Sequence, residues 1–352
     1  MKDFEEQKSR HTADELRQWQ ALPLEVKIGM TKTRIRQWVN EYGEDGVYVS
    51  FSGGKDSTVL SHIIDSMYPN NEIPRVFVNT GLEFPEIVEF VKRDPRAVLL
   101  RPQMNFKKVI EKYGYPFISK EVSQKIHEYR HAKSDIQKKR LQRFFDGERT
   151  DKNGEKSRFN LDKWKFALDA PFNITHQCCF VMKKNPAKHY EKKTDRKPFT
   201  AEMAQESALR KQVWLKHGCN MYDKKRPKST PLAFWTEQDI LQYIKKYNVK
   251  ICSVYGDIVV KSDTVPEMQM SMFDCGMCDF VSENLCTTGM RRTGCMFCGF
   301  GCHQVDDKRF LIVKELHPKI YDWIMKPWEE GGLDYKRVID WFNEHGNLHI
   351  KY

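Results

Sequence analysis

The segment Ser52–Ser57, with the sequence Ser-Gly-Gly-Lys-Asp-Ser, has the residue types of a phosphate-binding loop. It follows the apolar run of residues 47–51 and precedes a helical pattern, so it joins a strand to a helix. Gly53 and Gly54 let backbone N–H groups approach an anion, and the helix start adds unpaired amides and a positive dipole end. Lys55 adds a point charge, and the flanking serines add hydroxyl donors. We therefore expect a pyrophosphate site here.

Strands and helices alternate around this loop. Apolar runs occupy residues 47–51, 75–79 and 97–100, with helical patterns between them. This alternation predicts an α/β fold, with a parallel sheet covered by helices on both faces. Ligands of such sheets bind at the carboxyl ends of the strands. The segments Ser52–Ser57 and Asn79–Glu83 both follow a predicted strand, so both are expected at that edge.

Three regions are expected along the chain. Residues 1–45 form a helical lead-in, which begins at a capping box over Thr12–Glu15. Residues 46–245 form the nucleotide-binding domain, with a charged insertion near 120–165. Residues 246–352 form a cysteine-rich and helical C-terminal region. The insertion is either a solvated excursion or a basic arm that contacts nucleic acid.

Composition narrows the class of protein. The 352 residues carry a formal net charge of +11, which favours a polyanionic partner such as tRNA or DNA. No apolar run is long enough to span a membrane, and the start of the chain has no apolar core of a signal peptide, so a cytoplasmic protein without membrane contact is expected. The 10 cysteines are then better explained as metal ligands or redox groups than as disulfides.

The loop lacks the spacing of a Walker A or a Rossmann motif. It resembles the PP-loop of the ATP pyrophosphatase superfamily, and three further blocks resemble the phosphoadenosine phosphosulfate (PAPS) reductase family within it. These blocks are residues 79–86 (Asn-Thr-Gly-Leu-Glu-Phe-Pro-Glu), 201–210 (which departs from the family pattern at Met203 and Ala204) and 231–241.

This resemblance implies an adenine nucleotide α-hydrolase-like, Rossmann-like fold that binds ATP or an adenylyl sulfonucleotide with Mg2+. It implies catalytic roles for Lys55 and Asp56. The nucleotide-binding residues it implies are Ser52, Gly53, Gly54, Lys55, Asp56, Ser57, Phe77, Val78, Asn79, Thr80, Gly81 and Glu83.

The iron–sulfur branch of the family carries an adjacent cysteine pair and a distant Cys-x-x-Cys. By this resemblance, Cys178, Cys179, Cys295 and Cys298 are expected to hold a 4Fe-4S cluster. Local spacing offers zinc as the alternative, because Cys275 and Cys278 precede Cys295 and Cys298 at a zinc-ribbon distance. We favour the cluster, since adjacent cysteines are awkward in a zinc ribbon. Cys275, Cys278, Cys286 and Cys302 are then left without a role, and Cys219 and Cys252 are expected in the core.

One departure bears on the reaction. Sulfonucleotide reductases resembling this chain end in a cysteine-bearing tail, whereas the last cysteine here is Cys302. The expected function is therefore adenylation of an acceptor, most simply a nucleic acid, followed by sulfur transfer from a donor such as a cysteine desulfurase. The alternatives are a reductase that forms sulfite from adenylyl sulfate or its 3′-phosphorylated form, and a non-catalytic, zinc-containing nucleic-acid-binding module. A homo-oligomer is compatible with the sequence.

Overall fold

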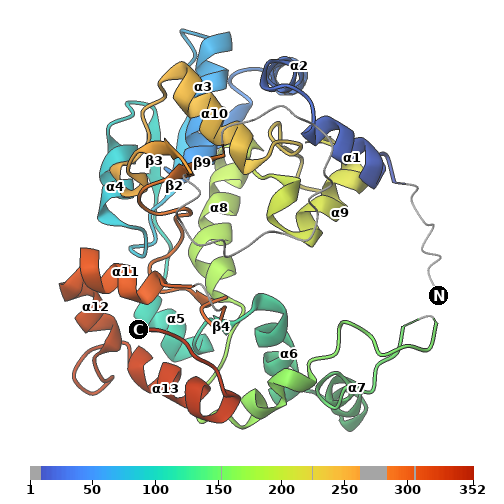
Figure 1. The fold of residues 1–352 in the computed structure, drawn as a ribbon, viewed down its shortest axis with the longest axis vertical. Helices are drawn as coiled ribbons and strands as arrows, with labels where there is room; N and C mark the ends of the chain where they lie inside the picture. The colour runs from blue at the N-terminus through green and yellow to red at the C-terminus, as the bar shows by residue number, and fades with distance from the viewer. Residues whose placement is uncertain (1–8, 152, 224, 262–283, 305–306) are drawn as a thin grey trace. The chain divides into compact units, whose positions relative to one another are not determined.

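The computed structural model describes residues 9–151, 153–223, 225–261, 284–304 and 307–352 (Figure 1). Its α-helices are α1 (Ala13–Gln20), α2 (Leu24–Tyr42), α3 (Lys55–Met67), α4 (Pro85–Lys92), α5 (Phe106–Tyr113), α6 (Lys120–Arg130), α7 (Asp135–Phe145), α8 (Asn185–Thr194), α9 (Ala208–His217), α10 (Glu237–Tyr247), α11 (Arg309–Leu316), α12 (Pro318–Met325) and α13 (Tyr335–Gly346). Short helical turns are η1 (Asp162–Asp169), η2 (Phe180–Lys184), η3 (Ala204–Glu206) and η4 (Ser253–Tyr255).

The strands are β1 (Val47–Ser50), β2 (Arg75–Val78), β3 (Ala97–Leu100), β4 (Phe117–Ile118), β5 (Lys197–Phe199), β6 (Asn220–Met221), β7 (Lys228–Ser229), β8 (Ile258–Val260), β9 (Leu285–Thr287) and β10 (Gly299–Phe300). The central sheet has the order β3-β2-β1-β5-β7-β6. In it β1 runs parallel to β2 and β5, and β5 runs parallel to β7, whereas β6 is antiparallel to β7. This confirms the predicted α/β fold with a mainly parallel sheet flanked by helices.

The sheet places the phosphate loop at the carboxyl end of β1. Val47, Tyr48 and Val49 of this strand are all buried, so side chains on both of its faces are covered, as expected of a parallel strand between helices. The loop leads into α3, whose residues Val59, Leu60, Ile63 and Ile64 are fully buried. Their spacing forms one apolar stripe, so the packing of α3 fixes where the helix begins and where the loop lies.

The capping box expected over Thr12–Glu15 occurs in the structure. The Thr12 side chain accepts from the backbone of Glu15, whose carboxylate accepts from the backbone of Thr12. The same reciprocal pair joins Thr236 and Asp239 at the start of α10. Asp239 also accepts from the buried Nζ of Lys27 at 2.7 Å, which ties α10 to α2.

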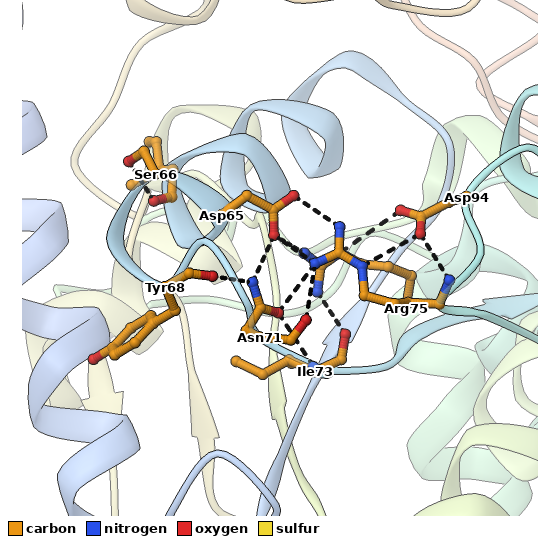
Figure 2. A network of polar contacts seen from close by, with 9 residues as sticks. Asp65, Ser66, Tyr68, Asn71, Ile73, Arg75 and Asp94 are labelled. Carbon is orange, nitrogen blue, oxygen red and sulfur yellow. Dashed lines mark hydrogen bonds and ion pairs between the residues drawn. The ribbon is translucent and has the colours of Figure 1, made fainter.

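The far end of α3 is held by a polar network (Figure 2). Arg75, the first residue of β2, is fully buried and donates to Asp65 near the end of α3 and to the Ile73 carbonyl. Arg96 donates to both oxygens of Asp65 at 2.8 and 2.9 Å. Burial alone would raise the pKa of Asp65, but hydrogen bonds from Arg96 and Asn71 and the two arginine charges outweigh it and lower the pKa.

The chain forms two compact units, neither of which is continuous in sequence. Unit 1 comprises residues 1–77, 84–100 and 188–293, and unit 2 comprises residues 78–83, 101–187 and 294–352. These groupings differ from the contiguous regions 1–45, 46–245 and 246–352 expected from the sequence, because the segment after β2 and the C-terminal tail fold with the insertion. Within the described residues, no helix is long and apolar enough to cross a bilayer.

Unit 2 has its own core around the short parallel pair β4 and β10, where Gly299 lies opposite Phe117. Aromatic rings surround the pair: Phe117 stacks on Phe342 of α13, and Tyr335 contacts Phe117 with ring centroids 5.2 Å apart. The Tyr335 hydroxyl donates to the Phe297 carbonyl at 2.8 Å. Tyr335 and Phe342 of α13 are therefore core residues of unit 2.

Candidate phosphate loop and cysteine site

The backbone of the phosphate loop depends on its two glycines. Gly53 has φ +71°, and a Cβ there would lie 2.8 Å from Ile87 Cγ2 and 2.9 Å from Val91 Cγ2. Gly54 is the residue before α3, and a Cβ there would lie 3.1 Å from the Tyr255 hydroxyl. Gly53 is therefore required by both conformation and space, whereas Gly54 is required mainly by the close approach of another group.

Hydroxyl groups hold the loop in shape. The Ser57 hydroxyl donates to the Gly54 carbonyl at 2.9 Å and accepts from the backbone N–H of Ser52 at 3.2 Å. The Ser52 hydroxyl accepts from the backbone N–H of Gly54 at 3.3 Å. Ser52 and Ser57 thus organise the loop as well as offering the donors predicted from the sequence.

Lys55 is buried, with only 3% of its surface exposed. Its Nζ donates to the Arg291 carbonyl at 2.8 Å and pairs with Glu237 at 3.2 Å. Glu237 is the first residue of α10 and also pairs with the Arg291 side chain. Glu237 therefore orients the Lys55 ammonium group and balances its charge. The sequence analysis assigned no role to Glu237.

The start of α3 is covered by the Tyr255 side chain. The backbone N–H of Lys55 donates to the Tyr255 hydroxyl at 3.3 Å, and that hydroxyl lies 2.6 Å from the Thr293 hydroxyl. Burial, the main cause, raises the pKa of Tyr255 to about 12, so the hydroxyl stays protonated at neutral pH. The backbone N–H and the ammonium group of Lys55, both suited to binding phosphate, are thus already bonded to protein groups. The sequence signal for this cover is the Arg291-Arg292-Thr293 run just before the Cys-x-x-Cys, to which the sequence analysis assigned no role.

Asp56 provides a carboxylate beside the loop. Its Oδ1 is buried and has no hydrogen-bond partner among the described residues. Burial raises the pKa of Asp56, although the positive charges of Lys55 and Arg292 oppose the shift. A buried carboxylate oxygen without a partner is suited to a hard cation such as Mg2+, so the residue predicted as the metal-side group fits that role.

The block after β2 is divided between the units. Residues 79–83 belong to unit 2, whereas residues 84–86 belong to unit 1, as does Phe77, which is buried on β2. The Glu83 carboxylate accepts from the Thr80 backbone N–H at 2.9 Å and from the Thr80 hydroxyl at 2.8 Å. Asn79 accepts from the N–H of Gly81, whose φ is +76°. Of the predicted nucleotide-binding residues, Ser52–Ser57 and Phe77 therefore fall in unit 1, and Val78–Gly81 with Glu83 fall in unit 2.

The four predicted cluster ligands all fall in unit 2. Cys178 and Cys179 precede η2, and Cys295 and Cys298 flank Met296, whose N–H donates to the Leu82 carbonyl at 2.8 Å. Burial raises the pKa of Cys178, and the charges of the other three thiols raise it further. Charges from Cys179, Cys295 and Cys298 thus act on the Cys178 thiol, although the Cys178–Cys179 pair is distant in sequence from the Cys-x-x-Cys.

As placed, no three or more His, Cys, Asp or Glu side chains in the described ranges form a group that could hold a metal ion. The donor set nevertheless fits a cationic cluster. Burial raises the pKa of Cys178, Cys295 and Cys298, so these thiols resist ionisation by themselves, and bound iron would favour their thiolate forms. A 4Fe-4S cluster on these cysteines therefore stays a prediction that the chemistry of the donors supports.

Lys183 links the cysteine motif to the block after β2. Its Nζ pairs with Glu83 at 3.1 Å, and Glu83 is itself buried. Partial burial alone would lower the pKa of Lys183, but the charges of Cys295 and Glu83 and hydrogen bonds to both raise it. Burial, with help from Glu83 and Cys298, raises the pKa of Cys295 to about 11 against the opposing charge of Lys183.

The remaining cysteines divide into three groups. Cys275 and Cys278, which the zinc alternative requires, lie outside the described residues. Cys219 and Cys252 are buried, as predicted for core residues. Cys286 lies on β9, and Cys302 is buried with its Sγ donating to the Gly299 carbonyl at 3.0 Å.

With this geometry in place, the comparisons with known proteins identify the family. The sequence matches the phosphoadenosine phosphosulfate reductase domain over residues 46–299. The chain belongs to this family. Among individual relatives, an uncharacterized protein of Methanocaldococcus jannaschii is 37% identical over 75 residues, which span 20% of this chain and 18% of that protein.

Among solved structures, the PAPS reductase domain of this chain is similar to the phosphoadenylyl-sulfate (PAPS) reductase from Candida auris in its phosphate complex. The sequences are 12% identical, the TM-score is 0.36, and the match covers 70% of this chain and 92% of that chain. A likeness at this level adds nothing about the reaction. The family match itself confirms the resemblance read from the PP-loop and the blocks that follow it.

Proposed function

We propose that this PAPS reductase family protein is an adenylating enzyme that activates a nucleic-acid oxygen for replacement by sulfur. The observation that carries the proposal is the phosphate loop. Gly53 and Gly54 leave its backbone without side chains, and the buried Lys55 follows them directly. Backbone amides that a ligand can approach closely, a helix start and a neighbouring ammonium together supply the donors and the positive charge that a pyrophosphate group requires. This supports an active nucleotide site over a non-catalytic binding module.

In the proposed reaction the acceptor oxygen attacks the α-phosphorus of ATP, and the bond between the α-phosphorus and the bridging oxygen breaks to release pyrophosphate. Lys55 and the loop amides would hold the pyrophosphate leaving group. Asp56 would help to hold Mg2+, and bound Mg2+ would offset the negative charge of the pyrophosphate. Sulfur at the oxidation level of sulfide then attacks the activated carbon, and AMP leaves with the original oxygen. These steps balance without a further reductant.

Cys178, Cys179, Cys295 and Cys298 are the residues that would hold a 4Fe-4S cluster in this enzyme. When bound, the cluster would supply redox-active iron and inorganic sulfide to unit 2. Lys183 and Glu83 would keep a paired charge beside Cys295. No step above depends on the cluster.

Reduction of a sulfonucleotide to sulfite is the second candidate, and the family match is the observation that favours it. It requires a reactive thiol. The candidates are Cys302 and the thiols from Cys275 to Cys286, of which Cys275 and Cys278 lie outside the described residues and Cys286 is half-buried on β9. Cys302 is 2% exposed, and burial, the main cause, raises its pKa to about 12. A buried thiol with a high pKa is a poor nucleophile, which places this reaction second.

The test is an anaerobic assay with Mg2+, sulfide and either total tRNA or duplex DNA. We expect pyrophosphate and AMP to form from ATP in amounts that depend on the nucleic acid. Lys55→Ala should lower the apparent affinity for ATP about 10- to 150-fold, the effect of a charged hydrogen bond worth about 1.5 to 3 kcal/mol. Sulfite from adenylyl sulfate, with no pyrophosphate from ATP, would establish the reductase instead.

A further inference from the structure

A basic hollow lies on the charged insertion of unit 2, away from any residue assigned above. It is lined by Arg140, Arg143 and Phe144 of α7 and by Arg149 and Thr150 of the following loop, and it encloses about 270 Å3. Three guanidinium groups therefore face one small space. Gathering like charges in this way is unfavourable unless an anion offsets them.

The arginine side chains keep hydrogen-bonding capacity for such an anion. Within the part of the chain that the structure describes, Arg143 has one ion pair, with Glu148 at 3.8 Å, in which both side chains are more than half exposed. Among the described residues, Arg140 and Arg149 have no ion pair. By contrast, Arg130 on α6 donates to the carbonyls of Phe172, Ala167, Leu168 and Ala170, which is a structural role.

The aromatic wall of the hollow favours phosphate over a base. The Arg149 guanidinium lies 4.2 Å from the centroid of the Phe144 ring, and the Lys125 ammonium lies 5.2 Å from it. This ring is already engaged by cations, so it is not a free stacking platform for a nucleobase. It instead holds Arg149 in place, which reduces the entropy that the arginine loses when it binds an anion.

The geometry points to a binding site for the phosphodiester backbone of a nucleic acid, contacted by Arg140, Arg143 and Arg149 without reading the base sequence. This inference rests on the proposed function, which makes a nucleic acid the acceptor. Arginine is the residue best suited to phosphate because its planar fork binds two oxygens at once. The net charge of +11 supports a polymer as ligand, since a polymer can contact several basic groups together.

The experiment compares two charge-matched triple variants of the full chain. In R140Q/R143Q/R149Q the hollow loses its guanidinium groups. In K133Q/K138Q/K139Q the same number of charges is removed from exposed lysines of the insertion that do not line the hollow. Binding of fluorescent single-stranded RNA, tRNA and duplex DNA is measured over a range of salt concentrations, and thermal unfolding verifies that both variants are folded.

We expect the arginine variant to lower the slope of log affinity against log salt by about 0.7 to 1.8, because it loses one or two phosphate contacts worth about 0.7 to 0.9 each. The lysine variant should change the slope less than half as much, and changing the base sequence of the probe should have no effect. Comparison of the three probes identifies the source of the backbone. Equal effects of the two variants would overturn the inference, because they would indicate a diffuse basic surface. Full inhibition of wild-type binding by equimolar inorganic phosphate would also overturn it.

If the triple arginine variant does not fold, R143Q alone provides the test. It removes one arginine of α7, whose ion pair with Glu148 is long and exposed, and it should still lower the slope by about 0.7. No change in R143Q would count against the site. The two proposals can also fail separately. Nucleic-acid-dependent release of pyrophosphate, together with an unchanged salt slope in the arginine variant, would overturn the site alone. Slope loss in the arginine variant without any reaction of ATP would overturn the proposed chemistry alone.

Discussion

Replacing Tyr255 with phenylalanine tests whether the cover over the phosphate loop competes with nucleotide. The hydroxyl accepts from the Lys55 backbone N–H at 3.3 Å and lies 2.6 Å from the Thr293 hydroxyl. If the Lys55 N–H is needed for phosphate, then ATP must displace this contact. Tyr255→Phe would remove that cost while keeping the ring, so the substitution should tighten nucleotide binding.

The magnitude follows from the two hydrogen bonds. Each is worth about 0.5 to 1.5 kcal/mol net, and the longer one contributes at the low end. Their loss should destabilise the covered state by about 1 to 2 kcal/mol, which corresponds to about 5- to 30-fold tighter binding. Thr293→Val breaks the shorter contact from the other side and should give part of the same gain.

The assay is titration calorimetry with a non-hydrolysable ATP analogue and Mg2+. Tyr243→Phe is the matched control, because Tyr243 is also a buried tyrosine but its hydroxyl lies 2.9 Å from His62 Nδ1. The control should leave affinity unchanged. Unchanged or weaker binding by Tyr255→Phe would refute the reasoning, since it would show that the hydroxyl does not compete with the nucleotide.

Three further predictions follow from single contacts. Gly53→Ala should lower the free energy of unfolding in urea by about 1 to 3 kcal/mol, because it introduces backbone strain and overpacking. Gly54→Ala should lower it less, and the reverse order would contradict the loop geometry. Asp65→Asn should cost about 3 kcal/mol at about pH 7, because Arg75 stays buried without its nearest charge partner. The folded-state pKa of Asp65 is lowered, so this difference should hold above the ordinary aspartate pKa and shrink as the pH falls through the folded value; a difference independent of pH down to about 3 would argue against the pair. Cys179→Ser should abolish iron binding in anaerobically purified protein, whereas Cys219→Ser should retain about four irons and absorption near ~400 nm; stoichiometric zinc in the wild type would exclude the cluster.

The sequence alone determined the features that depend on local order. The Ser52–Ser57 motif, the strand before it and the helix after it are adjacent in the chain, so their geometry follows from glycine conformation, strand alternation and helix periodicity. The caps at Thr12 and Thr236 are likewise local, since donor and acceptor lie three residues apart. The family could be recognised for the same reason, because its motifs are short and contiguous.

Only the tertiary structure decided the contacts that join distant residues. Glu237 aims Lys55 from 182 positions away, and Tyr255 covers the helix start from 200 positions away. The cysteine pair and the Cys-x-x-Cys fold in one unit with Lys183, and the arginines of the insertion gather around one hollow. Such pairings depend on how buried surfaces pack against each other, and the order of residues along one segment carries no signal for them.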